Sequence, residues 1–503
     1  MGSLAKLISV APVGFEGHIV EVESDLTRGL PGLQIVGLGN KTIDEAKERV
    51  KSAVSNSLLE YPAKRITINL APAELPKDGT QYDLPIALAI LVSSGQLRQS
   101  DVDGAVFAGE LALDGRLRPI SGAVTISETS RNAGYHTLYV PTANVAQANL
   151  VEGIAIVGID SLKQLYLHLK GEVKIPTQET LPGPVEHMLP TNAVNLDDIY
   201  GQEQAKRAMI IAAAGHHNIL LSGSPGAGKT MLAKALLSLL PALSAEERLI
   251  VTKIHSLAGL VIDDTIQMRP FRSPHHTSSQ IALIGGGTKA RPGEISLAHL
   301  GVLFLDEIPE YPRSTLEALR QPLEDKQIAV SRASGRAVYP ADFMLVATMN
   351  PCPCGYYGDS DRECTCTMTQ ILAYQKRLSG PLLDRIDLTV PVSRVPSEQL
   401  LVRKVVHDSQ QSPMYDTILR AKERQNERYK SSMKYNSSLS SSEIQKQITL
   451  GPKEKALLDA AATKLKLSAR SYFKVIKVAR TIADLADDQD ISTTHLAEAL
   501  QYR

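Results

Sequence analysis

The chain has 503 residues, enough for about three domains that each bury a core. Lys plus Arg and Asp plus Glu are equal at 54 each, so the net charge neither indicates nor excludes a nucleic-acid partner, and any such contact must come from a local patch. No apolar run reaches ~18 residues, and the first residues lack the long apolar stretch of a signal peptide. We therefore exclude membrane-spanning and secreted classes and expect a cytoplasmic protein without membrane partners.

The first part of the chain mixes strand and helix patterns, which predicts a separate α/β domain over residues 1–170. Alternating apolar runs predict strands at residues 18–23, 33–38 and 65–70. Thr42, with Glu45 three residues later, predicts a helix start, and apolar residues at helical spacing extend this helix to Leu58. Residues 171–195 are rich in Pro and polar side chains and lack periodicity, so we expect a linker there.

A phosphate-binding motif follows the linker. It consists of Gly223, Ser224, Pro225, Gly226, Ala227, Gly228, Lys229 and Thr230, a full match to G-x-x-x-x-G-K-[ST]. A short apolar run at 219–221 precedes it and good helix formers follow it, so a strand, a glycine loop and a helix are expected in order. In that context Lys229 reaches the outer phosphates of ATP, and the Thr230 hydroxyl ligates Mg²⁺.

Two further strand-like runs end in residues that ATP hydrolysis requires. The first ends in Asp306, which would hold Mg²⁺ through water, and Glu307, which would polarise the attacking water as general base. The second is followed by Asn350, whose amide can orient the same water. Arg385 lies in a loop after that strand.

These features in this order resemble the AAA+ ATPases, with Asn350 as sensor 1 and Arg385 as the arginine finger. Segments 285–307 and 379–387 are similar to the magnesium-chelatase-like branch, and the chain from Gly14 onward is similar to the ComM/YifB family of bacterial competence-associated ATPases. The resemblance implies an α/β AAA+ core and a C-terminal helical lid. Their expected bounds are 196–395 and 396–503.

The same resemblance implies further roles. An arginine finger reaches the nucleotide of a neighbouring subunit, so the AAA+ resemblance implies a ring. The ComM/YifB resemblance implies that this ring is a homohexamer that drives DNA branch migration during recombination, with DNA and recombination proteins as partners. A stretch such as 197–202 lies beside the adenine in AAA+ relatives, so Ile199 and Tyr200 are expected there. Arg470, at the head of a predicted lid helix, is expected to be sensor 2 and to contact the γ-phosphate.

The N-terminal region resembles the Lon protease domain in the loop 76–83, which begins PKDG, and in the stretch 109–122. In that family a catalytic Ser follows the first segment and a catalytic Lys follows the second. Here the two positions hold Gln81 and, approximately, Val124. A Ser–Lys dyad needs a hydroxyl and an amine, so we expect a proteolytically inactive domain that serves oligomerisation or binds a partner.

Two loops of the ATPase region are candidates for DNA contact. Alternating runs on either side of residues 333–335 predict a hairpin whose tip is basic, and a glycine-rich loop at 285–293 suits the pore of a ring. Such side chains could follow phosphates without reading bases, although solvated surface loops are the alternative. The basic residues expected at DNA are Lys289, Arg291, Lys326, Arg332 and Arg336.

The chain has four cysteines, Cys352, Cys354, Cys364 and Cys366, which form two close pairs in one loop after Asn350. In a cytoplasmic protein this arrangement predicts a tetrathiolate Zn²⁺ site rather than disulfides. The C-x-C spacing is less regular than C-x₂-C, so disulfides or free thiols stay open as alternatives.

The remaining residues are predicted to be helical, apart from a Ser-rich stretch at 436–442 that we expect to be a loop or a flexible break. Two other functions stay open beside the DNA motor. One is a chelatase-type subunit that inserts Mg²⁺ into a porphyrin, although the chain lacks the D-x-S-x-S metal motif of that system's partner. The other is a protein-remodelling ATPase, which would need an aromatic pore loop where this chain has glycine and arginine. The sequence favours the DNA motor.

Overall fold

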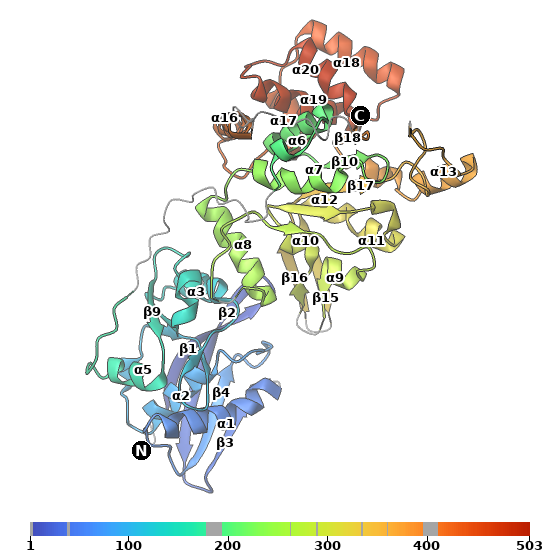
Figure 1. Ribbon diagram of the computed structural model, residues 1–503. Coiled ribbons are helices and arrows are strands. Elements are labelled where there is room, and N and C mark those ends of the chain that lie inside the picture. The colour runs from blue at the N-terminus through green and yellow to red at the C-terminus, as the bar shows by residue number, and fades with distance from the viewer. Residues whose placement is uncertain are drawn as a thin grey trace.

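The computed structural model describes residues 4–37, 41–177, 194–261, 263–287, 290–332, 335–359, 361–395 and 411–503. Figure 1 shows an α/β unit formed by the N-terminal residues at one end of the molecule and the helical C-terminal residues at the other. The ATPase core lies between them. None of the described helices combines the length and the apolar character needed to cross a membrane.

A seven-stranded sheet forms the centre of the N-terminal unit, in the order β3-β4-β2-β1-β5-β8-β9. β1 and β2 form an antiparallel hairpin, whereas β1, β5, β8 and β9 run parallel to one another. The strands are β1 (Ala5–Val13), β2 (Glu16–Thr27), β3 (Gly32–Val36), β4 (Arg65–Ala71), β5 (Ala105–Phe107), β8 (Thr137–Pro141) and β9 (Ala155–Ile159), with a small ribbon of β6 (Glu110–Leu111) and β7 (Leu117–Arg118). The predicted α/β character of this region is therefore confirmed.

Helices cover this sheet. They are α1 (Lys41–Asn56), α2 (Asp83–Ser93), α3 (Ala123–Asn132), α4 (Val145–Ala148) and α5 (Leu162–Leu169), with short 3₁₀ turns η1 (Gln99–Asp101) and η2 (Thr142–Asn144). Every residue of α2 is buried, as its continuous apolar sequence requires. The expected bounds of α1 were wrong at both ends. The helix already includes Thr42, and Leu58 lies beyond it with φ +62° and 81% exposed.

The predicted linker begins with residues that still belong to the N-terminal unit. Ile175 is buried in the same apolar core as α2 and β4. Residues 178–193 lie outside the described part of the chain. Most residues of the predicted linker 171–195 therefore lie outside the described part of the chain, and the linker stays a prediction.

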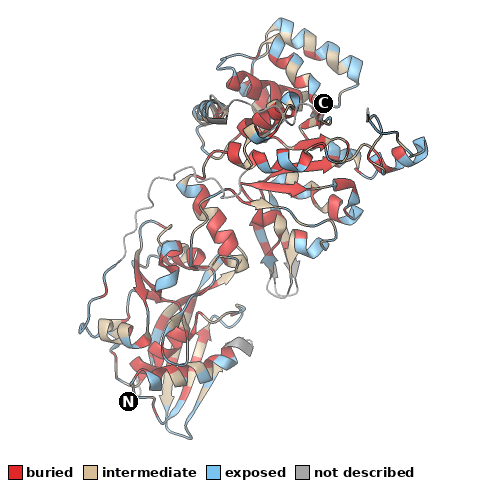
Figure 2. Ribbon diagram, viewed as in Figure 1, coloured by how far each residue is buried: buried red, intermediate tan, exposed pale blue. Residues whose placement is uncertain are grey.

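The ATPase core has a five-stranded parallel sheet in the order β11-β14-β17-β10-β18. Its strands are β11 (Phe271–Arg272), β14 (Val302–Leu305), β17 (Met344–Met349), β10 (Ile219–Ser222) and β18 (Leu388–Pro391). Figure 2 shows β14, β17 and most of β10 buried, in line with their largely apolar sequences, whereas β11 at the edge is half-buried. The strands predicted before the phosphate loop, before Asp306 and before Asn350 are thus β10, β14 and β17. Parallel strands end at one edge of a sheet, so these three motifs meet there.

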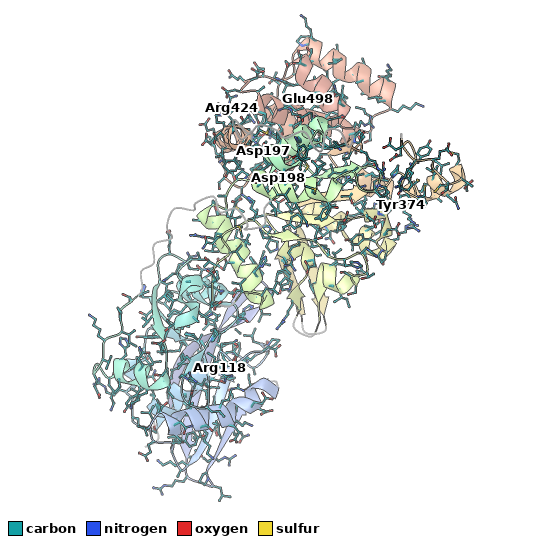
Figure 3. All side chains as sticks on the ribbon, viewed as in Figure 1. Arg118, Asp197, Asp198, Tyr374, Arg424 and Glu498 are labelled. Atoms are coloured by element: carbon teal, nitrogen blue, oxygen red, sulfur yellow. The ribbon has the colours of Figure 1, made fainter. Side chains whose placement is uncertain are left out.

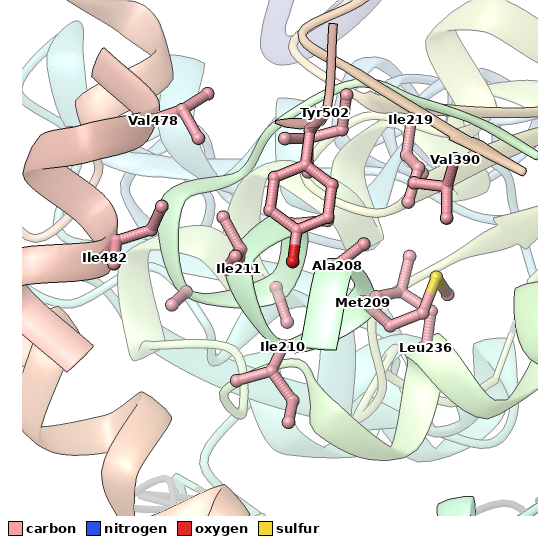
Figure 4. Packing of buried hydrophobic residues seen from close by; sticks show 14 of the residues in the cluster. Ala208, Met209, Ile210, Ile211, Ile219, Leu236, Val390, Val478, Ile482 and Tyr502 are labelled. Carbon is pink, nitrogen blue, oxygen red and sulfur yellow. The ribbon is translucent and has the colours of Figure 1, made fainter. Parts of the chain in front are cut away.

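Helices and turns surround the core sheet. They are η3 (Leu196–Asp198), α6 (Glu203–Gly215), α7 (Lys229–Ala235), η4 (Leu236–Leu239), α8 (Ala245–Ala258), α9 (Gln280–Ile284), α10 (Glu294–Leu297), η5 (Ile308–Glu310), α11 (Arg313–Ala318), α12 (Arg320–Asp325), α13 (Met368–Gln375) and α14 (Gly380–Leu383). The apolar core packs α6 between the sheet and the C-terminal helices. Figure 4 shows Met209 and Ile211 of α6 among Ile219, Val390 and Tyr502.

Two antiparallel hairpins extend from the core. They are formed by β12 (Gly285–Gly286) with β13 (Arg291–Pro292), and by β15 (Gln327–Arg332) with β16 (Gly335–Pro340). The hairpin predicted around residues 333–335 is therefore confirmed, while 333 and 334 themselves lie outside the described residues. β12 contacts β15, so the two hairpins lie side by side.

The C-terminal residues form a helical unit of α16 (Gln411–Tyr429), η6 (Asn436–Ser438), α17 (Ser441–Gln447), α18 (Pro452–Leu465), α19 (Ala469–Leu485) and α20 (Thr493–Gln501). An ion pair of 2.8 Å joins Arg207 of α6 to Glu498 of α20, which Figure 3 labels. The expectation of a loop or flexible break at 436–442 was partly wrong, because residues 436–438 form the turn η6 and residues 441–442 begin α17. The Ser440 hydroxyl accepts from the backbone N–H of Glu443 and so begins α17.

Helix α8 joins the N-terminal unit to the core by packing against α3 (Figure 1). The hydroxyl of buried Ser256 accepts the backbone N–H of Gly122 at 2.9 Å and donates to Gln147 at 2.7 Å. Lys253 of α8 pairs with Glu128 of α3 at 2.5 Å. These buried polar contacts fix the two units against each other, because breaking them would leave unsatisfied groups.

The turn between β1 and β2 forms a second junction, with the hairpin β15–β16. The ring of Phe15 lies edge-on to Tyr339 of β16 at 6.4 Å, and the Lys253 amine lies 4.1 Å from the same phenylalanine ring. Gly14 has φ +61°, and a Cβ there would stand 2.6 Å from the Cβ of Ala337. Only glycine allows this approach of the turn to the hairpin.

Candidate ATP site and cysteine cluster

The phosphate loop runs from the end of β10 to the start of α7. A Cβ on Gly223 would stand 2.1 Å from the carbonyl oxygen of Val392, so this position requires glycine for close packing. Gly228 has φ +87° and is the N-cap of α7. The loop therefore presents backbone N–H groups and a helix N-terminus toward one space, as the motif predicts.

Lys229 is folded back onto this loop. Its amine donates to the carbonyls of Gly223 at 2.6 Å and Ser224 at 2.9 Å, and to the amide oxygen of Asn350 at 3.1 Å. Burial lowers the pKa of this amine, and the charges of Asp306 and Glu307 oppose the shift. Phosphate oxygens in the loop would provide a stronger partner for this cation than neutral carbonyls do.

The expected Mg²⁺ ligands lie opposite each other. The hydroxyl of Thr230 is 3.4 Å from one carboxylate oxygen of Asp306. The other oxygen of Asp306 accepts from the Thr348 hydroxyl at 2.5 Å, which fixes the carboxylate. An exposed hydroxyl facing an oriented carboxylate fits Mg²⁺, which prefers oxygen ligands and keeps several waters. The ion would neutralise phosphate charge when bound.

Glu307 and Asn350 lie together beside this site. The backbone of Glu307 is left-handed, with φ +49°, and its N–H donates to the Thr348 hydroxyl at 2.9 Å. The Asn350 amide donates to the Glu307 carboxylate at 3.2 Å while its oxygen accepts from Lys229. A left-handed backbone at a non-glycine residue, here Glu307, is typical of functional positions. The predicted base, the predicted sensor and the phosphate-loop lysine therefore form one connected group.

Arg385 and Arg470 lie elsewhere, on a shared partner that sequence reasoning missed. Both donate to the carboxylate of Glu324 on α12, Arg470 at 2.8 Å. Burial alone would raise the pKa of Glu324, but the hydrogen bond and charge of Arg385, followed by those of Arg470, hold it below its ordinary value. The two arginines thus face one location. No sequence signal links Glu324 to them, because the contact exists only in the folded chain.

The two residues expected beside the adenine have different environments. Ile199, next to η3, is 6% exposed and belongs to the apolar core, whereas Tyr200 is half-buried. Gln202, two residues further along, bonds the backbone of Ala227 in the phosphate loop at 3.4 Å. This segment therefore lies close to the loop, although apolar packing explains the position of Ile199 by itself.

Of the residues expected at DNA, two have described side chains. Lys326 forms an ion pair with Asp342 at 2.8 Å, and Arg291 of β13 is exposed. In the hairpin Arg332 pairs with Gly335 and Arg336 pairs with Ser331, and the side chains of both arginines lie outside the described part of the chain. Lys289 lies outside it altogether.

The four cysteines come together as predicted. Their sulfur atoms all lie within 4.8 Å of one another, and Cys352 is buried. Sulfur–sulfur distances are 3.3 Å between Cys352 and Cys354, 3.5 Å between Cys354 and Cys364, and 3.7 Å between Cys352 and Cys364. Four thiolates bound to one zinc at about 2.3 Å would lie about 3.8 Å apart, so this set fits a tetrahedral Zn²⁺. All four are free cysteines, which argues against the disulfide alternative.

The Lon-like positions carry no catalytic group in the folded structure. Gln81 is buried and donates to the carbonyl of Asp78 at 3.3 Å, and Val124 is fully buried in α3. An inactive domain stays our prediction for this unit.

Comparison with known proteins identifies the family. Family models described as "Magnesium chelatase, subunit ChlI", "Subunit ChlI of Mg-chelatase" and "Magnesium chelatase, subunit ChlI C-terminal" match residues 195–400, 22–144 and 409–503. The chain is 44% identical to the protein YifB of Salmonella typhimurium and 43% identical to the competence protein ComM of Haemophilus influenzae, over 100% of this chain and 97% of each relative. The chain belongs to the ComM/YifB family.

The family includes a magnesium-chelatase-like AAA+ domain, which indicates an ATPase that uses ATP and Mg²⁺. A more distant match is the magnesium-chelatase 67 kDa subunit of Chlorobaculum parvum, which is 28% identical over 39% of this chain and 26% of that protein. The ComM/YifB relatives span the N-terminal unit, the core and the helical region alike.

Proposed function

We propose that this protein is an ATP-driven DNA motor that forms a hexameric ring and promotes branch migration during recombination in natural transformation. The observation that carries the proposal is the full-length similarity to a competence protein, combined with a connected ATP site. Natural transformation brings single strands into the cell, and their pairing with resident DNA creates junctions that a translocating ring can move. The ring would be cytoplasmic and would act with recombination proteins.

In this proposal each residue of the ATP site has one task. Residues 223–230 bind the phosphates, Thr230 and Asp306 hold Mg²⁺, and Glu307 removes a proton from the attacking water that Asn350 orients. Ile199 and Tyr200 flank the adenine. The shared contact with Glu324 supports a common location for Arg385 and Arg470 at the surface that meets a neighbouring nucleotide.

DNA would pass the two adjacent hairpins, β12–β13 and β15–β16. Arg332 and Arg336 stand near the tip of the longer hairpin, and Arg291 is exposed on the shorter one. Cationic side chains on neighbouring hairpins can follow phosphates independently of base sequence. Lys289 would join them. We assign Lys326 a weaker contribution, because it is paired with Asp342.

We further propose that residues 1–170 form an inactive Lon-like domain for assembly or partner binding, that 171–195 link it to the core at 196–395, and that 396–503 are the lid. The cysteine cluster would hold Zn²⁺.

The first test is the steady-state ATPase rate with and without forked DNA at two salt concentrations, with Glu307→Gln as the inactive reference. A DNA motor predicts stimulation that weakens as salt rises, because phosphate contacts release counterions. An ATPase that ignores DNA but responds to a porphyrin-binding partner would support the chelatase alternative, which the family-model names favour. Stimulation by an unfolded protein would support a remodelling ATPase.

A further inference from the structure

The loop between the two cysteine pairs leaves the ATP site and then returns to it. It starts two residues after Asn350 and extends from Cys352 to Cys366 on the arm that α13 continues, where Figure 3 labels Tyr374. Part of this loop contacts Pro225 of the phosphate loop and lies beside Ser224. The loop residues that make this contact are not part of the phosphate-binding motif or the expected Mg²⁺ ligands, and they include neither Glu307 nor Asn350.

Gly355 makes the first of these contacts. It is buried with φ +86°, and a Cβ on it would stand 2.6 Å from both Cγ and Cδ of Pro225. The next atom such a Cβ would meet is the amide carbon of Asn350 at 3.9 Å. The cysteine loop and the phosphate loop therefore touch without space for a side chain between them.

Asp359 makes the second contact, and it is polar. One of its carboxylate oxygens accepts from the backbone N–H groups of Asp361 at 2.9 Å and Arg362 at 3.2 Å. Ser224 of the phosphate loop, as the largest cause, and these two N–H groups lower the pKa of Asp359. The Asp359 side chain is 3% exposed. A buried carboxylate is therefore fixed within its own loop and lies beside the phosphate loop.

Arg394, which follows β18, closes the group. Its guanidinium lies 3.6 Å from Asp359, donates to the carbonyl of Pro225 at 3.1 Å and lies over the ring of Tyr356 at 5.6 Å. The backbone of Ser224 and Pro225 is thus held from two sides. The cysteine cluster fixes both ends of the segment that carries Gly355 and Asp359.

We propose that Gly355, Asp359 and Arg394 are positioning residues that hold Ser224 and Pro225 in the phosphate-binding conformation, so that the cysteine loop sets the affinity for nucleotide. A glycine-rich loop with φ values near +80° at Gly226 and Gly228 has many other conformations available, and an external brace reduces the entropy lost on binding. This inference rests on the proposed ATP site.

The chain offers matched controls within the same loop. Gly358 also has a left-handed backbone, φ +79°, but a Cβ on it would meet nothing within 4 Å. Gly355→Ala and Gly358→Ala therefore carry a similar backbone strain, while only the first displaces Pro225. Glu363 is an exposed carboxylate of the loop and serves as the control for Asp359.

The experiment measures the affinity of a fluorescent ATP analogue for the full-length protein in a Glu307→Gln background, together with bound zinc and the unfolding temperature. Gly355→Ala and Asp359→Ala should weaken binding about tenfold, equivalent to about 1.4 kcal/mol, whereas Gly358→Ala and Glu363→Ala should change it less than about twofold. Gly355→Ala should lose more thermal stability than Gly358→Ala, because only its Cβ clashes with Pro225. Unchanged zinc content and a folded Gly355→Ala variant at the assay temperature separate positioning from general unfolding.

Equal affinities in all four variants, with a parent that binds, would overturn the inference and leave the ATP site intact. Failure of the Glu307→Gln parent to bind would instead overturn the proposed ATP site, and this inference with it.

Discussion

Arg385 and Arg470 are held on one carboxylate, each donating to a different oxygen of Glu324. The first precedes β18 and the second opens α19, so the core and the helical region contribute one arginine each. Rotation of the helical region against the core would separate the pair or transfer it to another anion. In the proposed ring, a γ-phosphate from a neighbouring subunit would carry more charge than Glu324 and would accept from both arginines.

Removal of Arg385 should stop hydrolysis without preventing binding. An arginine that reaches the transferred phosphate from another subunit contributes about 10³-fold or more to kcat, so Arg385→Ala should lose that much ATPase activity while its ATP affinity changes little. Arg320→Ala, on the same helix as Glu324 and paired with nearby Glu317, is the control. Mixing Arg385→Ala with Glu307→Gln should restore part of the activity, since some interfaces then combine an intact base with an intact finger. Absence of restoration would contradict action between subunits.

Removal of the predicted general base, Glu307, should have a different effect from removal of Arg385. Glu307→Gln keeps the hydrogen-bonding shape of the side chain but removes its basicity, so ATP should bind normally and turn over about 10²–10⁴-fold more slowly. Single-turnover and binding measurements on the same sample separate the two steps. Undiminished turnover would place the general base on another residue.

The longer hairpin predicts how DNA affinity depends on salt. Arg332→Ala with Arg336→Ala should weaken DNA binding and lower the slope of log affinity against log salt by about two, because each arginine that neutralises a phosphate adds about one to that slope. Basal ATPase should stay near normal. Arg116→Ala with Arg118→Ala is the control, because both side chains are exposed on the N-terminal unit, where Figure 3 labels Arg118. An unchanged slope in the hairpin variant would exclude it from the DNA path.

The sulfur geometry predicts about one zinc per chain in protein purified under reducing conditions. Replacing Cys354 and Cys364 by Ser should remove it, lower the unfolding temperature and leave the remaining thiols reactive toward a thiol reagent. Atomic absorption and thiol titration measure the zinc content and the thiol reactivity. A wild-type protein without zinc, whose stability depends on oxidant, would favour the disulfide alternative.

Stability should depend on pH through Lys422 of α16. Lys422 is 8% exposed, and its amine lies 3.3 Å from the ring centre of Tyr435. Burial lowers its pKa to about 7, while the charges of Glu247 and Asp342 oppose the shift and that of Arg269 supports it. The unfolded chain keeps this proton up to the ordinary pKa of 10.5, whereas the folded chain releases it at about 7. The free energy of unfolding should therefore rise with pH between these values and be lowest below pH 7.

The contribution of this one proton is about 1.4 kcal/mol per pH unit. Lys422→Met should remove that part of the slope in denaturant unfolding at pH 7, 8 and 9. Lys430→Met, at the exposed end of the same segment, should retain it. The same slope in Lys422→Met as in the wild type would mean that the amine is charged throughout.

Local patterns were sufficient to predict much of the fold and of the ATP site. The phosphate loop, the acidic pair after β14 and Asn350 after β17 are each defined by a few adjacent residues, and parallel strands bring them together. The hairpin at 327–340 was also predictable, because two alternating runs flank short turn residues.

Other features depend on contacts between distant segments and left no local pattern. Glu324 is one acidic residue among several near its helix, and only folding brings Arg385 and Arg470 to it. The contacts of Thr348 with Asp306 and Glu307 had one weak indication in the sequence, a hydroxyl near the end of an otherwise apolar strand. Ser440 in the stretch 436–442 was misread, because a hydroxyl that favours a loop can also cap a helix.

The close approach of Gly14 to Ala337 means that substitutions in the N-terminal unit and in the hairpin constrain each other. A larger residue in the β1–β2 turn would collide with the hairpin, and a larger residue at 337 would displace the turn, so neither position can drift unless the other compensates. The same holds for Phe15 and Tyr339, whose rings lie edge to face. A lineage that exchanged its N-terminal unit for an unrelated one would have to rebuild the base of its hairpin at the same time.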